Sequence, residues 1–315
     1  METHFESVYG LPGKQPEPLS WSQDGRLKFI DFRLRWEGRV NRSDLVEFFN
    51  ISLPQASLDL SKYTETAPDN LKYDPKAKAY IRTEYFHPIY QRSASKTYLS
   101  ELLALDAGTM EAASSFVRWL PPMAAVPTPG REVDGAVLMH LLNAIREGRM
   151  INVQYQTMGR ENATHRILSP HAIAHDGQRW HVRAYCHTRN KFRDFVIARL
   201  STVQVGGQSA VPVAEDQEWH TILTLVLVPH PALPHASRRA LEIDYAMTDG
   251  RLEVKCRHAM LLYTLIRLGL MYERNVPAVQ QVVLFNEEEI EPYLQMLGAS
   301  LEGQQGRLFR GNVGA

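Results

Sequence analysis

Strict alternation of side-chain types over residues 179–187, RWHVRAYCH, is the feature that most limits how this chain can fold. Apolar or small side chains occupy the even positions, beginning with Trp180 and Val182, and polar ones occupy the odd positions. A period of two is typical of a β-strand with one face in a core and the other in solvent. The face predicted to be exposed carries two arginines and two histidines with no acid among them.

Neighbouring segments repeat this alternation. Residues 151–157 (INVQYQT) form one alternating run, and residues 161–203 continue as strand-like segments separated by a DG turn and a TRNK turn. Short strands joined by tight turns predict a compact, strongly bent antiparallel sheet of the small-barrel class.

Charge is distributed unevenly along the chain. The net charge is zero, but residues 151–200 contain eight Lys/Arg against three Asp/Glu, and five of the twelve histidines. Such a local excess of cations predicts an anionic ligand, because guanidinium groups bind phosphate or carboxylate through paired hydrogen bonds. If the polar faces of the strands converge, they form an anion-binding pocket from Ser169, His171, His181, Arg183, Tyr185, Arg193 and Arg199.

The same side chains allow other interpretations. His171 and His175 are four residues apart, a spacing that aligns zinc ligands on a helix. The surrounding pattern is that of a strand, however, and no cysteine or carboxylate cluster accompanies the two histidines, so we expect no metal. An ordinary charged surface, with the last strand's arginines paired to Asp194 or Asp176, remains an alternative.

Catalytic constellations are not found in the sequence. Ser169 has His171 two residues away, but no nucleophile elbow surrounds the serine and no third partner is nearby. A phosphate-cradling glycine loop or Walker pattern does not occur either. We therefore expect no enzymatic activity, no catalytic residue and no cofactor.

The first third of the chain has the element order of a winged helix-turn-helix. Three helix signals, at 22–37, from Asn41 onward and at 52–64, precede two short strands at 71–73 and 79–83. In that fold the third helix enters the DNA major groove and the hairpin, called the wing, touches the backbone.

Side chains of this segment supply candidate DNA contacts. Gln55 has the shape to read adenine, but its spacing from Ser52 also gives it a capping-box role, and both remain open. The helix face predicted to be exposed carries Gln55, Ser57, Asp59 and Lys62. The candidate phosphate contacts are Arg39, Arg42, Lys62, Lys72, Lys76 and Lys78. Residues 20–90 hold eleven basic and ten acidic residues, so DNA binding rests on element order, and protein docking is an alternative.

The remaining patterns predict a multidomain α+β protein. Its expected parts are a mobile tail (1–19), the winged domain (20–90), a helical connector that dimerises or packs on its own chain (91–133), a strand-rich ligand-sensing domain (134–208), a domain of order β-α-β-β-α (219–302) and a second tail (303–315). No apolar run reaches the ~20 residues of a membrane helix, and no secretory signal opens the sequence. With two cysteines only, we expect a reduced, cytoplasmic setting without a membrane partner.

These motifs resemble a known family. The stretch RILSPHAIAHDGQRWHVRAYCHTRNKFRDFVIARL resembles the WYL domain, an Sm-like small β-barrel of bacterial regulators, with Trp180-His181-Val182 at the name-giving triplet. Together with GRVNRSDLVEFFNISLPQASLDLSKY and NLKYDPKAKAY, it is similar to the BrxR/CapW group of phage-defence-associated regulators. The resemblance covers about residues 20–300.

The resemblance implies a homodimeric transcription factor, usually a repressor. Such a protein binds an inverted repeat of double-stranded DNA upstream of a phage-defence operon such as BREX, and senses an anionic nucleotide or oligonucleotide in its WYL pocket. By resemblance, the ligand-binding residues are Tyr155, Ser169, His171, His181, Arg183, Arg193 and Arg199. His181 stands where the family usually has a tyrosine, which leaves the ligand itself open.

A second function fits the same residues. A single-strand nucleic-acid-binding accessory protein would use the basic barrel in place of the winged helix, stacking bases on Trp180, Tyr155 and Tyr185. An enzyme acting on nucleotides is a third candidate, and it lacks a catalytic constellation.

Overall fold

The computed structural model describes residues 22–91, 94–127, 129–271, 277 and 279–302. The chain divides into two compact units, Met1–Pro127 and Thr128–Ala315, and each is described here by itself. The predicted tails fall almost entirely outside the described residues. In the described part of the chain, no helix is long and apolar enough to cross a membrane.

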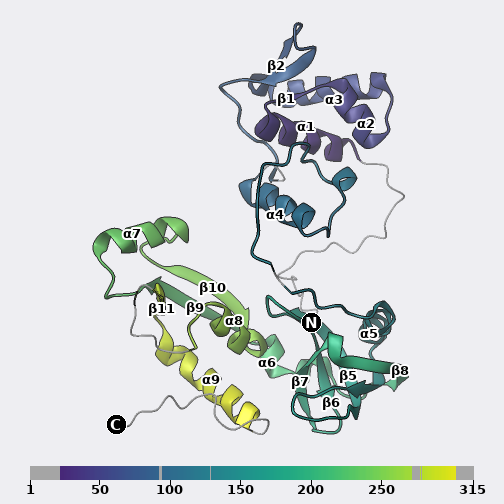
Figure 1. Ribbon diagram of the computed structural model, residues 1–315, viewed down its shortest axis with the longest axis vertical. Coiled ribbons are helices and arrows are strands. Elements are labelled where there is room, and N and C mark those ends of the chain that lie inside the picture. Colours follow the sequence, from purple (N-terminus) through teal and green to yellow (C-terminus); the bar gives the residue numbers. More distant parts are fainter. Residues whose placement is uncertain (1–21, 92–93, 128, 272–276, 278, 303–315) are drawn as a thin grey trace, which may run out of the picture. The chain divides into compact units, whose positions relative to one another are not determined.

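The first unit has the predicted three helices and hairpin (Figure 1). Its helices are α1 (Gln23–Glu37), α2 (Arg42–Phe49), α3 (Leu53–Thr66) and α4 (Ser95–Asp106). Its strands are β1 (Arg39–Val40), β2 (Leu71–Asp74) and β3 (Ala79–Arg82), which form an antiparallel sheet in the order β1-β3-β2.

Local sequence signals set the helix boundaries of this unit. Gly38 ends α1 in the left-handed conformation (φ 75°), which costs glycine little because it has no Cβ. Asn41 and Asp44 form a reciprocal capping box at the start of α2. Ser52 caps α3 by accepting a hydrogen bond from the backbone N–H of Gln55 at 3.3 Å.

The connector packs on its own chain within this unit. Leu102 of α4 and Phe116 are buried in the core that α1 provides through Phe29 and Phe32. Tyr98 of α4 stacks on Trp36 at a ring-centroid distance of 4.5 Å. This helix is therefore part of the first unit's core.

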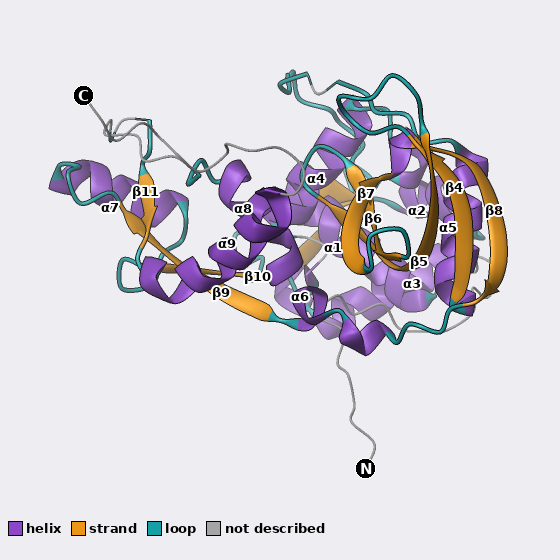
Figure 2. Ribbon diagram, turned by 90° about the horizontal axis from the view of Figure 1, so that it is seen from below, coloured by secondary structure: helices purple, strands orange, loops and turns teal. Residues whose placement is uncertain are grey.

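The second unit opens with α5 (Gly135–Glu147), whose apolar face packs on a five-stranded sheet. The strands are β4 (Arg149–Tyr155), β5 (Thr164–His175), β6 (Trp180–Cys186), β7 (Lys191–Val196) and β8 (Leu200–Gln208). They pair antiparallel in the order β7-β6-β5-β4-β8, and Figure 2 shows the longer ones curving. Their ladder leaves β7 and β8 as edges among the described residues, so the hydrogen bonds form an open sheet and not the closed Sm-like barrel that the sequence predicts.

Strand β6 keeps the predicted alternation but not the predicted exposed face. Val182 and Ala184 are fully buried, as expected from the even positions. His181 and Arg183, on the face predicted to meet solvent, are only 3% and 2% exposed. The expectation of a half-buried strand is therefore wrong for the centre of β6, because a later part of the chain covers its polar face.

That later part is a small α+β domain (Figure 1). A connecting segment with α6 (Gln217–His220) leads into it, and it contains β9 (Ile222–Pro229), α7 (His235–Asp244), β10 (Leu252–Arg257), α8 (Leu261–Arg267), β11 (Val282–Leu284) and α9 (Glu287–Glu302). The sheet order is β10-β9-β11. The strand predicted directly after α7 is absent from the described residues, since Ala246 and Asp249 have φ angles of 48° and 50° that interrupt an extended backbone.

Candidate functional site

Arg183 lies at the centre of a buried ion cluster on β6. Its Nε and Nη2 donate to the two carboxylate oxygens of Asp216 at 2.7 and 2.8 Å. Nη2 also donates to Glu218 Oε2 at 2.7 Å, and Nη1 donates to Asp194 Oδ1 at 3.4 Å. The paired contact with Asp216 is the bidentate geometry that guanidinium groups form with carboxylates. Carboxylates of this chain therefore already hold the arginine that the sequence assigns to an anionic ligand.

His171 joins the same cluster. Its Nε2 lies 2.9 Å from Asp216 Oδ2, and its side chain is almost fully buried. Burial alone would raise the pKa of the Asp216 carboxyl, but hydrogen bonds from Arg183 and His171 outweigh burial and hold that pKa well below its usual range. Asp216 is therefore a carboxylate that links β5 and β6 to the segment leading into the C-terminal domain.

His181 has its own acid. Its Nε2 lies 2.9 Å from Asp176 Oδ2, and its ring faces the ring of Tyr263 on α8 at 5.1 Å. Asp176 also accepts hydrogen bonds from the backbone N–H groups of Gln178 and Arg179. Burial opposes ionisation of Asp176, yet these hydrogen bonds hold its pKa far below the usual value. His181 is therefore fixed between a turn of the sheet domain and a helix of the C-terminal domain.

Other predicted ligand residues lie apart from this cluster. Ser169 Oγ is 2.8 Å from His187 Nε2 and accepts a hydrogen bond from Ser209. The Tyr155 hydroxyl accepts a hydrogen bond from the backbone N–H of Val196 at 3.3 Å. Burial lowers the pKa of the Arg193 guanidinium.

A bulge in β5 interrupts the regular pairing with β6 at His171. In the ladder between β5 and β6, Pro170 pairs with Ala184 and Ala172 pairs with Arg183, so His171 has no opposite residue. One extra residue in a strand reverses which face the later side chains occupy. The reversal therefore begins after His171, where Ala172 takes the place opposite Arg183, whereas Ser169, opposite Tyr185, keeps the face that simple alternation assigns to it.

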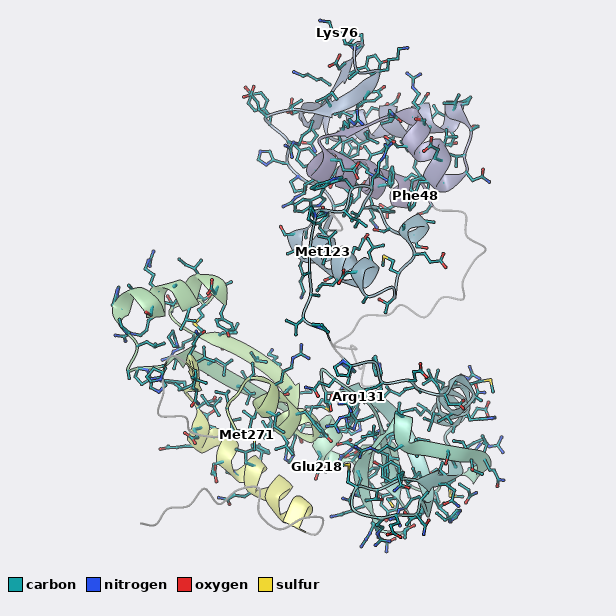
Figure 3. The ribbon with its side chains drawn as sticks, viewed as in Figure 1. Phe48, Lys76, Met123, Arg131, Glu218 and Met271 are labelled. Carbon is teal, nitrogen blue, oxygen red and sulfur yellow. The ribbon has the colours of Figure 1, made fainter. Side chains whose placement is uncertain are left out.

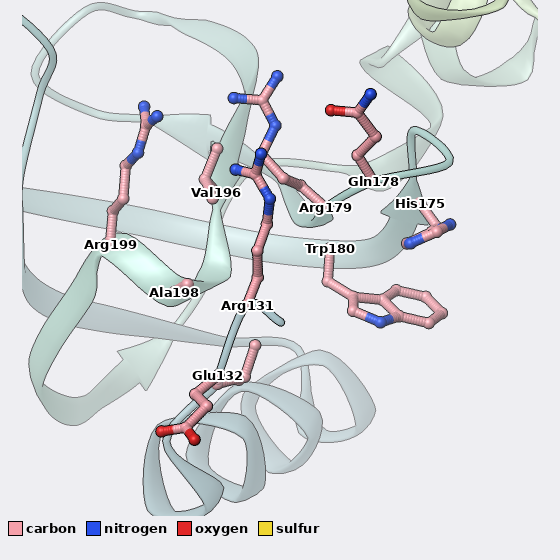
Figure 4. Close-up of a pocket in the computed structure, with 10 residues that line it drawn as sticks. Arg131, Glu132, His175, Gln178, Arg179, Trp180, Val196, Ala198 and Arg199 are labelled. Atoms are coloured by element: carbon pink, nitrogen blue, oxygen red, sulfur yellow. The ribbon is translucent and has the colours of Figure 1, made fainter. Parts of the chain in front are cut away.

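A pocket of about 310 Å³ lies elsewhere on the same domain (Figure 4). We call it the arginine pocket, and its lining residues are Arg131, Glu132, Val133, His175, Gln178, Arg179, Trp180, Val196, Ala198 and Arg199. Figure 4 shows the guanidinium groups of Arg131, Arg179 and Arg199 extending in the same direction. Trp180 is 52% exposed, and its ring lies 4.6 Å from the ring of His175. Three cations beside an open aromatic face suit an anion that carries a ring.

Sequence reasoning found only part of this pocket. Arg199 is the one residue of the seven predicted ligand contacts that lines it. Trp180 was expected on the apolar face, and its exposure follows from its place at the very start of β6. Arg131 comes from the proline-rich segment before α5, where no periodic pattern indicates a position in space.

The winged unit places the predicted phosphate contacts, Lys62 of α3 apart, on β1, α2 and the hairpin of β2 and β3. Arg42 is exposed at the first turn of α2, and Lys72, Lys76 and Lys78 are exposed on the hairpin, with Lys76 at its tip (Figure 3). Arg39 is exposed on β1, next to β3. These positions agree with a cationic wing beside α3.

Contacts within the fold engage the polar side chains of α3. Gln55 Nε2 donates to Asp59 Oδ1 at 3.2 Å, and Arg26 Nε donates to Asp59 Oδ2 at 2.6 Å. Asp59 is fully buried, so its predicted place on the exposed face of α3 is wrong. Ser57 Oγ donates to the carbonyl of Leu53. Lys62 forms an exposed ion pair with Glu65 at 3.2 Å.

Comparisons with known proteins agree with this three-part architecture. Residues 22–104 match the family model of the BrxR transcriptional regulator winged helix-turn-helix domain. Residues 136–205 match the WYL domain, and residues 222–290 match the BrxR transcriptional regulator C-terminal dimerization domain. The element order and the three matches follow one another along the chain.

Curated relatives extend the match across the domains. The DNA-binding transcriptional repressor CapW of Pseudomonas aeruginosa is 44% identical over 277 residues, which are 87% of this chain and 93% of the relative. CapW of Escherichia coli (strain KTE188) is 43% identical with the same coverage. This chain belongs to the CapW family of transcriptional repressors. The family consists of regulators and not of enzymes, as the sequence predicts.

One solved structure covers most of the chain at low similarity. The proteasome accessory factor B/C (PafBC) of Arthrobacter aurescens aligns with 96% of this chain and 52% of its own, at 16% identity and a TM-score of 0.25.

Proposed function

We propose that this protein is a homodimeric repressor that binds an inverted repeat upstream of a phage-defence operon. The observation that carries this proposal is the winged unit itself, with α3 and a cationic hairpin, in a chain 43–44% identical to CapW repressors. A two-fold dimer presents two copies of α3, which suits an operator with two half-sites spaced by whole helical turns. Such a protein acts in the cytoplasm, where the DNA is.

The same proposal includes an anionic nucleotide or oligonucleotide as ligand. We place it in the arginine pocket, where Arg131, Arg179 and Arg199 supply cations and Trp180 supplies a stacking surface. In this proposal the ligand does not contact Tyr155, Ser169 or Arg193, since none of them lines this pocket. His171, His181 and Arg183 act in this proposal by holding the sheet domain to the C-terminal domain.

This division of roles provides a way for ligand binding to change DNA binding. Arg179 lines the arginine pocket and also donates from Nε to Asp176, the acid that holds His181 against Tyr263. A ligand that draws Arg179 away from Asp176 alters this contact with the C-terminal domain. If that domain dimerises, the ligand selects between dimer geometries that differ in their fit to the operator.

Mapping of protected bases tests the whole proposal. The duplex upstream of the gene is footprinted with the full chain, alone and with a short single-stranded oligonucleotide as probe. We expect two protected half-sites related by inversion, and a loss of protection when the oligonucleotide binds. If no upstream duplex is protected, the repressor proposal is wrong. If the protection is the same with and without the oligonucleotide, only the ligand proposal is wrong.

A single-strand-binding accessory protein remains the second candidate. The observation that favours it is the exposed indole of Trp180 beside three arginines, an arrangement that accepts stacked bases without sequence preference. A gel shift with random single strands and with the upstream duplex separates the two functions. Tighter binding to single strands than to any duplex selects the accessory role.

A further inference from the structure

The exposed face of α3 is apolar at its centre. Ala56, Leu60 and Tyr63 are fully buried and define the core side of the helix. These three residues lie on one face because they are four and seven positions apart. Leu58 comes two positions after Ala56 and therefore lies on the opposite face, with Pro54 and Ser61 one turn above and below it. Leu58 is 62% exposed and Leu53, in the first turn, is 58% exposed.

Polar groups that would read bases through hydrogen bonds are turned away from this face. The Gln55 amide donates to buried Asp59, and the Ser57 hydroxyl donates to the carbonyl of Leu53. Lys62 pairs with Glu65 at the far end of the helix. At its midpoint α3 therefore offers a groove the side chain of Leu58, between Pro54 and Ser61.

Thymine carries the one apolar group on base edges in the major groove. Its C5-methyl group distinguishes an A·T pair from the other pairs by contact and without hydrogen bonds. Exposed cations lie on other elements of the same unit, with Arg42 on α2 and Lys72, Lys76 and Lys78 on the hairpin. An apolar centre in a unit with exposed cations complements a duplex, whose phosphates lie on both sides of its grooves.

We propose that Leu58 determines sequence specificity by packing on the C5-methyl group of a thymine in each operator half-site. The proposal rests on the repressor function and adds how the operator is read. Its physical basis is the removal of one methyl group and part of a leucine side chain from water.

Deoxyuridine substitution isolates this contact, because deoxyuridine lacks only the methyl group and keeps the base pairing and charge of thymidine. The probe is the protected upstream duplex, made once with thymine and once with deoxyuridine at one half-site position at a time. For the full chain we expect one position per half-site where the substitution weakens binding about fourfold, from about 0.8 kcal/mol per buried methylene-sized group.

The Leu58→Ala variant completes a double-mutant cycle with the modified duplex. We expect it to bind the thymine duplex about as weakly as the native chain binds the deoxyuridine duplex, and to respond less than twofold to the substitution. Leu99→Ala serves as the matched control, because Leu99 is 57% exposed on α4 of the same unit. This control should keep the full discrimination between thymine and deoxyuridine.

The outcomes separate this proposal from the repressor function. If native chain and Leu58→Ala both bind the duplex and neither discriminates at any position, the reading by Leu58 is wrong and the repressor function stands. If Leu58→Ala keeps the native discrimination, another side chain contacts the methyl group and the proposal is wrong. If no duplex binds at all, the repressor proposal fails first, and circular dichroism shows whether each variant is folded.

Discussion

Arg183 and the arginine pocket lie on the same small sheet and illustrate two opposite environments for one residue type. Arg183 is 2% exposed and contacts three carboxylates, two of them contributed by the segment just before the C-terminal domain. Arg131, Arg179 and Arg199 line an open pocket beside an exposed indole. The residue pattern of a strand indicates which face its arginines occupy. Whether an arginine then pairs with a carboxylate of the chain or stays open to a ligand depends on segments far away in the sequence.

Removal of the Arg183 charge is the strongest test of this comparison. Arg183→Met leaves Asp216 and Asp194 without their common cation, so we expect the free energy of unfolding to fall by about 3–5 kcal/mol. Arg199→Met, in the pocket, should cost less than about 1 kcal/mol, as for exposed charges. Urea denaturation measures both variants. Equal losses would mean that the two environments do not differ as described.

The dependence of the unfolding free energy on pH provides a second test of the buried cluster. The folded-state pKa of Asp216 is depressed, so its stabilising contribution is present above the unfolded value of about 4 and is lost as pH falls below it. Burial raises the pKa of Asp194, so ionisation of that carboxyl opposes folding, and this opposite contribution weakens as pH falls. We expect Asp216→Asn to flatten the fall in unfolding free energy between pH 5 and pH 3 by about 1 kcal/mol.

The control for the acid series is Glu253→Gln, an exposed position on β10. It should leave the pH dependence of the unfolding free energy as it is in the native chain. A native chain whose stability does not change between pH 5 and pH 3 would contradict the ionised state of Asp216.

The pocket side of the comparison is tested by binding. Trp180→Ala should weaken binding of a short single-stranded oligonucleotide by about 1–3 kcal/mol, the usual worth of one stacked base. Fluorescence anisotropy with a labelled oligonucleotide measures the change. Trp119→Ala, 64% exposed in the first unit, is the matched control and should bind as the native chain does. Equal effects of the two substitutions would remove Trp180 from the ligand site.

The smallest expected effect concerns the hairpin. Lys76→Ala should lower affinity for all duplexes alike and reduce the slope of log affinity against log salt by about 0.9, one phosphate contact. Titrations at three salt concentrations measure the slope. Lys255→Ala, exposed on β10, should leave it unchanged. An unaltered slope for Lys76→Ala would exclude this lysine from the phosphate contacts.

Local signals made the winged unit predictable. Gly38, Asn41 and Ser52 act within a few residues of their own position, so the sequence reveals the helix boundaries that they set. The hairpin follows from alternation and a turn in the same way. Gln55 shows the limit of that reasoning, because its partner Asp59 is held by Arg26 from a different helix.

The candidate site depended on distant residues, which explains the errors there. The bulge at 170–172 breaks a period that is otherwise regular, and no residue type in that stretch requires it. The acids that neutralise Arg183 lie more than thirty positions further along the chain, at Asp216 and Glu218. Arg131 reaches the pocket from a segment without periodic structure.

Asp216 and Glu218 belong to neither of the two family modules that they connect, since those modules cover 136–205 and 222–290. A chimera that joins this WYL domain to a relative's C-terminal part at residue 206 would therefore discard both acids of this chain and leave Arg183 with Asp194 alone among its three carboxylates. We expect a junction after residue 221 to keep Asp216 and Glu218 together with the strand whose arginine they neutralise.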